Sequence, residues 1–248
     1  IKGSISDSGV FWAQSSTTYI PGIPSENHLM QDVSGIADRD FITLYTQPDF
    51  LSLMRLFSKT VRVGEGGVSM TYDSEVQISS DYSNVLSASA ANDSKFCMVV
   101  YYDAISGKYY LKISADGSLW SLPIAIASSE PIGETFNKPA VCFDSDGNIH
   151  IMVLRYESGY TSMFYGFMLR LADGTGNYPF SELSTQNAPP APDGIIGLSG
   201  LVTTGIDPTI CWLEGIPGMS RLAFRPARYQ TSGLIWGDFA IAHQEAIW

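Results

Sequence analysis

Residues 84–127 read NVLSASAANDSKFCMVVYYDAISGKYYLKISADGSLWSLPIAIA. The stretch divides into four short apolar segments, Asn84–Ala90, Lys95–Tyr102, Lys108–Ser114 and Ser118–Ala127, which small polar residues and glycine separate. Short apolar runs joined by such turn residues are typical of antiparallel strands connected by hairpins. We therefore expect one four-stranded antiparallel sheet over this stretch.

The same order of four segments recurs along the chain. The next two units are expected to contain the strands Lys138–Phe143, Asn148–Tyr156, Ser162–Leu171 and Asn177–Leu183, and then Gly197–Thr203, Thr209–Leu213, Arg221–Arg225 and Gly233–Ile241. A first unit, from about Asn27 to Ile78, requires that Phe50–Lys59 is at least partly a strand. Periodicity leaves this segment open, because its apolar residues also fit one face of an amphipathic helix.

Two features repeat with a period of about 55 residues. An acidic residue ends one strand of each unit, at Asp49, Asp103, Glu157 and Glu214, which are 54, 54 and 57 positions apart. A glycine also precedes an apolar or aromatic residue in Gly117-Ser118-Leu119-Trp120, Gly176-Asn177-Tyr178 and Gly233-Leu234-Ile235-Trp236. Four strands in each such period are typical of the blades of a β-propeller.

The predicted fold class is therefore all-β, a small β-propeller of four to five four-stranded antiparallel blades. Residues 1–248 would form a single domain. Gly9–Thr18 looks like an outer blade strand, which either completes a fifth, composite or incomplete blade with the C-terminal residues or marks where a longer chain was cut. A β-sandwich or jelly roll is the alternative, although neither requires a regular period. Because the chain begins with Ile1 rather than Met, we expect it to be a C-terminal fragment of a longer polypeptide.

Composition argues against several classes of partner. The 248 residues carry 14 Lys and Arg against 25 Asp and Glu, which gives a formal net charge of −11. Binding of nucleic acid depends on basic residues that neutralise phosphates, so no nucleic-acid partner is expected. No apolar run approaches the roughly 18 residues that a membrane-spanning helix needs, so we expect no membrane insertion.

No metal ion or other cofactor is predicted. Cys97, Cys142 and Cys211 lie in apolar stretches without zinc-site spacing, so we expect reduced packing residues, although a disulfide between two of them stays open. The three histidines share no spacing. The segment Asp144-Ser145-Asp146-Gly147-Asn148 is similar to the start of a calcium loop but lacks the distal Glu, so we interpret it as a hairpin turn.

The segment Ser114-Ala115-Asp116-Gly117-Ser118-Leu119-Trp120 resembles a shortened Asp box of the sialidase-like β-propellers. It lacks one residue between Asp and Gly, and Asp173-Gly174 with Tyr178 is a weaker copy. The resemblance implies that these residues brace the outer hairpin of a blade. It also implies a carbohydrate-related role, because such propellers occur in sialidases, glycan-binding lectins and the receptor-binding heads of bacteriophage tail fibres.

The predicted site lies on one face of the propeller. Loops between the second and third strands of each blade open on the same face as the loops that link the blades, here Ala13–Glu26, Ser79–Ser83, Ser128–Asn137 and Ser184–Ile196. Aromatic rings stack on the apolar side of sugars, and carboxylates accept hydrogen bonds from hydroxyls. The candidate ligand-binding residues are Asp49, Asp103, Glu157, Glu214, Tyr82, Tyr102, Tyr160 and Arg155, with Tyr19, Phe136 and Tyr156 as further aromatic residues of this face.

The leading interpretation is a module that binds a cell-surface glycan or receptor. It would be the distal host-recognition domain of a viral tail fibre or an extracellular adhesin, outside the cell or on the virion, with possible homo-oligomers formed through an upstream stem. The first alternative is a glycoside hydrolase that uses Asp103 and Glu157, supported by Glu214; the second is a purely structural, protein-binding propeller. No catalytic residue is assigned, because a sialidase needs an arginine cluster and the eight arginines do not recur at equivalent positions.

Overall fold

The computed structural model describes residues 29–37, 40–63, 70–93, 96–168, 183, 188–216, 219–231 and 233–246. These residues form antiparallel strands and no helix, which confirms the predicted all-β class. They make four sheets. The first two contain β1 (Leu29–Ala37), β2 (Asp40–Pro48), β3 (Met54–Val63), β4 (Met70–Tyr72) and β5 (Val76–Gln77), and then β6 (Val85–Asn92), β7 (Cys97–Asp103), β8 (Lys108–Ser114) and β9 (Ile124–Ser128).

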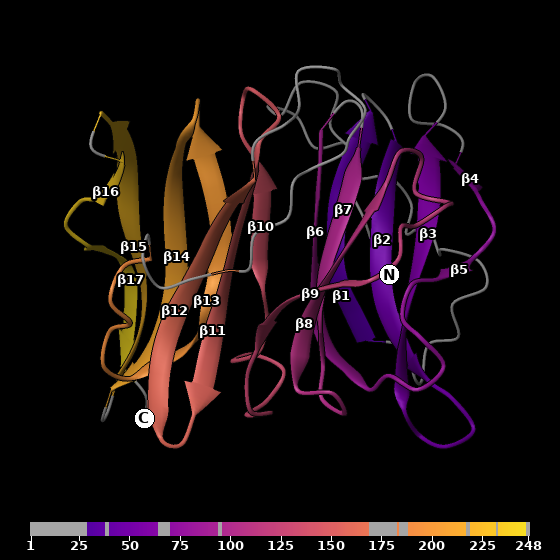
Figure 1. The fold of residues 1–248 in the computed structure, drawn as a ribbon, viewed down its shortest axis with the longest axis horizontal. Helices are drawn as coiled ribbons and strands as arrows, with labels where there is room; N and C mark the ends of the chain where they lie inside the picture. The colour runs from indigo at the N-terminus through magenta and orange to yellow at the C-terminus, as the bar shows by residue number, and fades with distance from the viewer. Residues whose placement is uncertain are drawn as a thin grey trace.

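The third and fourth sheets contain β10 (Ala140–Phe143), β11 (Ile149–Glu157) and β12 (Tyr160–Met168), and then β13 (Ile195–Thr204), β14 (Asp207–Ile216), β15 (Met219–Gln230), β16 (Gly233–Trp236) and β17 (Ala240–Ala246). In all four sheets each strand pairs with the next one in the chain, except that β5 pairs with β3 and β17 pairs with β15. The sheets lie side by side in chain order (Figure 1), and β1, β6, β10 and β13 contact one another in succession. Each sheet therefore corresponds to one of the predicted blades, and the first strands of neighbouring blades contact one another.

The apolar residues pack between the sheets. Each hydrophobic cluster in the described part of the chain joins two neighbouring sheets. Strand β7 shows how, because alternate side chains of a strand point to opposite faces. Met98 and Val100 pack toward the third sheet, whereas Val99 and Tyr101 pack toward the first. Burial on both faces explains the continuous apolar sequence of this strand.

Strand β3 resolves the open prediction for Phe50–Lys59 and confirms that this segment is partly a strand. The chain turns over residues 49–53, with Ser52 at a φ of 62°, and β3 begins at Met54. An amphipathic helix would bury Phe50, but this side chain is 92% exposed. The long pairing of β2 with β3 joins Asp40–Pro48 to Met54–Arg62, satisfies the backbone of both segments and outweighs the local helical periodicity.

Two other predicted strands have different limits. Ser118–Ala127 is a loop until Ile124, where β9 begins. Gly233–Ile241 is two strands, β16 and β17, which pair with different halves of β15. Pro226 lies between these halves and has no N–H for a ladder, while its carbonyl accepts a hydrogen bond from Gly237 N at 2.8 Å. The segment that follows β15 therefore pairs with the second half of this strand as β16, leaves it opposite Pro226, and pairs with the first half as β17.

The Asp-box-like turn braces the β8–β9 connection, as the resemblance implied. Ser114 Oγ accepts a hydrogen bond from Gly117 N at 2.9 Å, and Asp116 Oδ1 accepts others from Ser118 N and Leu119 N at 2.8 and 3.1 Å. The bonds from Ser118 and Leu119 lower the pKa of Asp116 to about 2. This turn fixes the edge of the second sheet.

Several predictions fall outside the described residues. These are the strand Gly9–Thr18, the linker Ala13–Glu26, Tyr19, all but Leu183 of the strand Asn177–Leu183, residues 184–187 of the linker Ser184–Ile196, and the weaker turn copies around Asp173-Gly174 and Gly176-Asn177-Tyr178. A fifth blade is therefore not tested. The three cysteines are free thiols, as expected. Within the described ranges no helix is long and apolar enough to cross a membrane.

Candidate functional site

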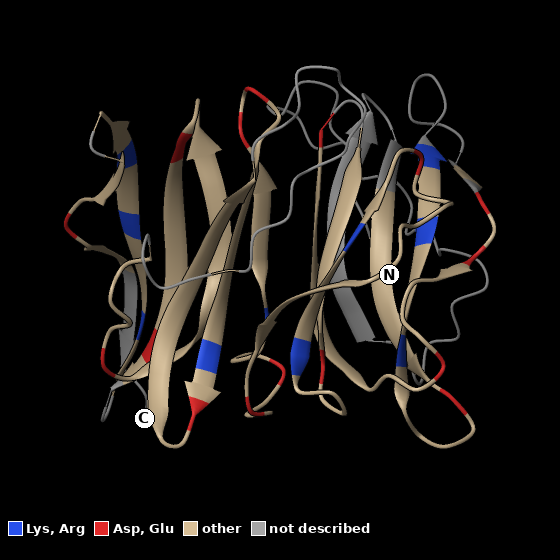
Figure 2. Ribbon diagram, viewed as in Figure 1, with Lys and Arg blue, Asp and Glu red and all other residues tan. Residues whose placement is uncertain are grey.

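The turns between second and third strands meet the loops that link the sheets, as predicted. Asn84 N donates to Asp103 Oδ1 at 2.7 Å, and Glu130 N donates to the carbonyl of Tyr156 at 2.9 Å. Both bonds connect a linking loop with a turn of this kind. We call this surface the linker face. Its β2–β3 and β11–β12 turns lie at the lower edge of Figure 1, and Figure 2 shows acidic residues at this edge as well as at the opposite one.

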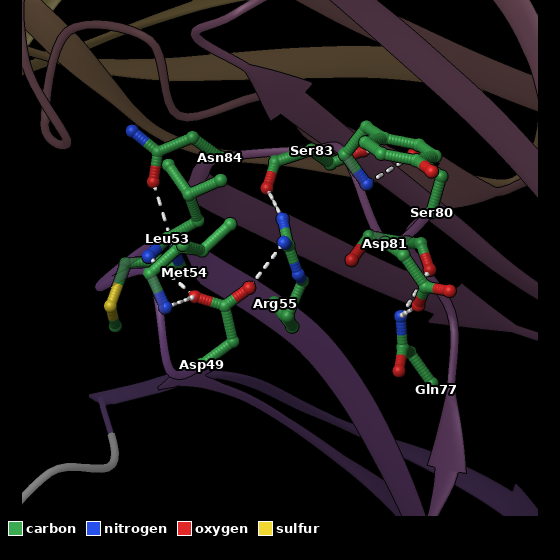
Figure 3. Close-up of polar contacts among 12 residues, drawn as sticks. Asp49, Leu53, Met54, Arg55, Gln77, Ser80, Asp81, Ser83 and Asn84 are labelled. Atoms are coloured by element: carbon green, nitrogen blue, oxygen red, sulfur yellow. Dashed lines mark hydrogen bonds and ion pairs between the residues drawn. The ribbon is translucent and has the colours of Figure 1, made fainter.

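Asp49 braces the β2–β3 turn of the linker face. Its Oδ1 accepts hydrogen bonds from Leu51 N and Leu53 N at 2.8 and 2.9 Å, and its Oδ2 is paired with the Arg55 guanidinium (Figure 3). Arg55 also donates to the carbonyl of Ser83 in the next linking loop. Desolvation opposes ionisation, but these backbone N–H groups and the cation outweigh it and lower the pKa of Asp49.

Asp103 braces the corresponding β7–β8 turn of the second sheet. Its Oδ1 accepts hydrogen bonds from Asn84 N and Ile105 N at 2.7 and 3.2 Å, and its Oδ2 accepts one from Ser106 Oγ at 2.7 Å. The residue is buried. Asn84 in turn accepts a hydrogen bond from Met54 N through its Oδ1 at 3.0 Å (Figure 3). The first linking loop is thereby fixed to both sheets.

The other two recurring acids also bond within the chain. Glu214 is buried, accepts a hydrogen bond from Trp212 Nε1 at 2.7 Å and is paired with Arg221. Glu157 is exposed and paired with Arg155. Asp49 and Asp103 thus accept hydrogen bonds from backbone N–H groups of their turns, whereas Glu157 and Glu214 pair with an arginine of the same or the next strand.

The predicted aromatic residues divide between the core and the surface. Tyr102 is fully buried and donates its hydroxyl to the carbonyl of Ser129 at 2.8 Å, and burial raises its pKa to about 12. Phe136 is buried with its ring edge-on to Tyr156. The structure does not place Tyr102 on the surface of the linker face, because its strand β7 is covered by sheets on both sides. Tyr82 and Tyr160 are exposed.

One hollow of the linker face has a volume of about 550 Å³ and lies between the first two sheets. Its lining comes from β2, β3 and the turn between them, from β5 and the following linker, and from the β7–β8 turn: Gln47, Pro48, Asp49, Phe50, Leu51, Leu53, Arg55, Phe57, Gln77, Asp81, Tyr82 and Ile105. Phe50 and Tyr82 are 92% and 84% exposed. Exposed aromatic rings beside a hollow of this size are typical of a small-molecule site.

Phe50, Gln77 and Asp81 belong to this hollow and were not predicted. The sequence does carry a signal for Phe50. This large apolar residue directly follows the recurring acid Asp49, in a turn where its side chain is not part of a strand, so it can be exposed. Gln77 and Asp81 have no such signal. Gln77 Nε2 donates to Asp81 Oδ1 at 2.8 Å and to the carbonyl of Ser79 at 3.0 Å (Figure 3), a contact that depends on the path of the linker.

A second hollow, of about 290 Å³, lies along the β11–β12 hairpin. It is lined by Arg155, Glu157, Ser158, Tyr160, Ser162 and Phe164, and the guanidinium of Arg155 lies 5.3 Å from the centre of the Phe164 ring. The structure thus brings Asp49 and Tyr82 together in one hollow, and Arg155, Glu157 and Tyr160 in another. Asp103, Tyr102 and Glu214 are not among the described lining residues of either.

The calcium-like segment is a turn between β10 and β11. Asp144 Oδ1 accepts hydrogen bonds from Asp146 N and Asn148 N, each at 2.9 Å, and its Oδ2 lies 3.2 Å from His150 Nε2. The other ring nitrogen of His150, Nδ1, lies 2.6 Å from the buried hydroxyl of Tyr165. The carboxylate is therefore engaged by the chain, and the described residues contain no group of three or more metal-ligating side chains.

No model of a known protein family matches the sequence, and comparison with curated proteins finds no match. The structure is similar to that of Trypanosoma rangeli sialidase in complex with the inhibitor DANA, with a TM-score of 0.55 and 13% identity over 87% of this chain and 38% of that chain. The fold is a sialidase-like β-propeller. This propeller spans less than half of the sialidase chain, and at this identity the likeness establishes the fold alone.

Two glycoside-acting proteins also match the propeller, with lower scores. Bombyx mori GH32 β-fructofuranosidase has a TM-score of 0.47 and 12% identity over 88% of this chain and 49% of that chain. Penicillium chrysogenum α-L-arabinanase complexed with arabinobiose has a TM-score of 0.43 and 10% identity over 79% and 60%. Among the described arginines of the propeller, Arg55, Arg155 and Arg221 lie on different blades, and each is paired with a nearby acid.

Proposed function

We propose that this protein binds carbohydrate at the linker face, with the Phe50–Tyr82 hollow as its main saccharide site. The observation that carries the proposal is the pair of aromatic side chains, 92% and 84% exposed, that line one hollow of about 550 Å³. Sugar rings have an apolar side that stacks on such rings, while their hydroxyl groups need hydrogen-bond partners at the rim. Gln77 and Asp81 supply these partners.

A glycan array tests the proposal, followed by calorimetric titration of the best oligosaccharide. We expect Phe50→Ala and Tyr82→Ala each to weaken binding about tenfold, since stacking contacts are worth about 1 kcal/mol or more. Leu119→Ala is the matched control, because Leu119 is similarly exposed but lies in the β8–β9 connection and lines neither linker-face hollow. Absence of binding, or equal loss in all three variants, would contradict the site.

The proposed function includes a location outside the cell. We infer that the ligand is a cell-surface glycan and that the protein acts outside the cell or on a virion, as a host-recognition or adhesion domain. Labelled protein incubated with intact bacterial cells tests this. Staining that Tyr82→Ala abolishes would support recognition at a cell surface, and staining of no strain in a broad panel would argue against it.

A glycoside hydrolase is the second candidate, favoured by the propeller shared with a sialidase. Asp103 and Glu157 were the expected acid pair. Asp103 is a poor candidate for proton transfer, because it is buried and both its carboxylate oxygens accept hydrogen bonds within the chain. Release of reducing ends from polysaccharides separates the two functions: a hydrolase would release sugars and lose this activity in Glu157→Gln, whereas a binding module releases none.

A further inference from the structure

We infer that the Phe50–Tyr82 hollow takes a neutral saccharide and discriminates against acidic ones. The inference rests on the proposed function and names the class of ligand for the same site. It follows from how the charges around the hollow are already paired.

Arg55 is the one cation among the described residues that line the hollow. Its side chain is only 5% exposed, and its two terminal nitrogens bond to the Asp49 carboxylate and the Ser83 carbonyl. A carboxylated or sulfated sugar is normally held by a guanidinium or ammonium that can form new hydrogen bonds with it. Arg55 could do so only by releasing the turn that Asp49 braces.

The rim of the hollow carries a further negative charge. Asp81 is exposed there and accepts a hydrogen bond from Gln77 Nε2 at 2.8 Å. With Asp49, Asp81 and Arg55 ionised, the lining has one carboxylate more than it has cations, and the whole chain has a net charge of −11. An acidic sugar would therefore meet repulsion at the rim without a compensating ion pair.

The second hollow of the linker face differs in this respect. Its arginine, Arg155, is paired with Glu157 and lies over the ring of Phe164, but the two charged side chains are 30% and 60% exposed. An exposed ion pair is weak, and this lining carries one carboxylate and one cation. The discrimination is therefore inferred for the Phe50–Tyr82 hollow alone.

The experiment uses a glycan array that carries each neutral oligosaccharide beside its sialylated, uronate or sulfated counterpart. We expect the Tyr82-dependent signals to come from neutral members, with acidic counterparts about tenfold weaker. Binding of the neutral members should change less than about twofold between 50 and 500 mM NaCl, because no ion pair forms with the ligand. The variant Asp81→Lys should gain the acidic members, while Asp81→Asn, which removes the charge without adding a cation, should gain few.

The outcomes separate the inference from the function beneath it. Acidic members that bind the unaltered protein as well as their neutral counterparts, with Tyr82→Ala abolishing both, would overturn the inference and leave the saccharide site standing. A failure of Asp81→Lys to bind any acidic member, with its unfolding midpoint unchanged, would also count against it. Absence of any Tyr82-dependent signal would overturn the proposed function and the inference together.

Discussion

Asn84 donates its backbone N–H to Asp103 Oδ1 at 2.7 Å and accepts, through its own Oδ1, a hydrogen bond from Met54 N at 3.0 Å. One linker residue thus joins the start of β3 to the end of β7. The two sheets that contribute to the Phe50–Tyr82 hollow are therefore held together close to residues that line it, Leu53 and Ile105. Rigid walls of this kind reduce the conformational entropy that a site loses when it binds a ligand.

Replacement of Asp103 tests this connection. Asp103→Ala leaves the N–H groups of Asn84 and Ile105 without their acceptor, and we expect the free energy of unfolding to fall by about 2 kcal/mol. Chemical denaturation measures the change. Asp81→Ala is the control, because its exposed carboxylate bonds only to Gln77 among the described contacts, and it should cost less than about 0.5 kcal/mol. Equal effects would show that Asp103 is not a brace.

Gly117 joins the second sheet to the first. Its φ is +77°, and a Cβ there would lie 2.8 Å from Ile42 Cδ1. Gly205 has a φ of +64° but open space around it. We expect Gly117→Ala to lower the free energy of unfolding by about 2 kcal/mol more than Gly205→Ala does, because only the first adds crowding to the backbone strain.

A double variant separates these two costs. Ile42→Val removes the Cδ1 atom that the new methyl group would meet. Combined with Gly117→Ala, it should cost less than the sum of the two single changes, as a thermodynamic cycle measures. Strict additivity would show that the crowding is relieved elsewhere.

His150 should make stability depend on pH. Burial lowers its pKa below 6.5, although the hydrogen bond and the charge of Asp144 oppose this shift. The unfolded chain therefore binds the proton more readily than the folded one. The contribution of neutral His150 to the free energy of unfolding is fully present above about pH 6.5. It is lost as the pH falls below that value, by at most about 1.4 kcal/mol per pH unit.

Unfolding free energies between pH 5 and 8 test this. His150→Gln should abolish most of the slope in this range, since glutamine does not titrate. The unaltered protein, measured over the same pH range, is the reference. A slope that survives in His150→Gln would show that another group carries it.

The thiols should be protected while the protein is folded. Burial, with the Asp116 and Asp93 carboxylates nearby, raises the pKa of Cys97 to about 11, and burial beside Asp144 raises that of Cys142 to about 12. At pH 8 we expect both to react with a disulfide reagent at least 100-fold more slowly than free cysteine. All three thiols should react fast in denaturant, and rapid reaction of Cys97 in the folded state would contradict its placement.

The two exposed aromatic residues should contribute to binding and not to stability. Phe50→Ala and Tyr82→Ala remove side chains that are almost fully exposed, so each should change the free energy of unfolding by less than about 0.5 kcal/mol. Tyr102→Ala provides the contrast and should cost about 3 kcal/mol or more, because its ring is buried. A large loss in Tyr82→Ala would show that it packs against the chain.

The sequence predicted the fold because its signals are local. Turn residues between short apolar runs define the first three strands of the second sheet to within two residues, although β9 begins six residues later than expected, and the spacing of Asp49, Asp103 and Glu157 marks equivalent positions of successive sheets. Where local signals conflicted, as in the segment after Asp49, pairing with a distant strand decided the outcome.

The amino-acid sequence by itself determined the blades, their period and the face on which the linking loops and turns meet, since hairpins form between neighbouring segments. Only the tertiary structure decided which side chains of that face reach solvent. Tyr102 and Tyr82 were both predicted for this face. Strand β7 is covered on both sides, so Tyr102 is buried, whereas the linker leaves Tyr82 exposed. Exposure depends on contacts between residues far apart in the chain, and no local pattern records these contacts.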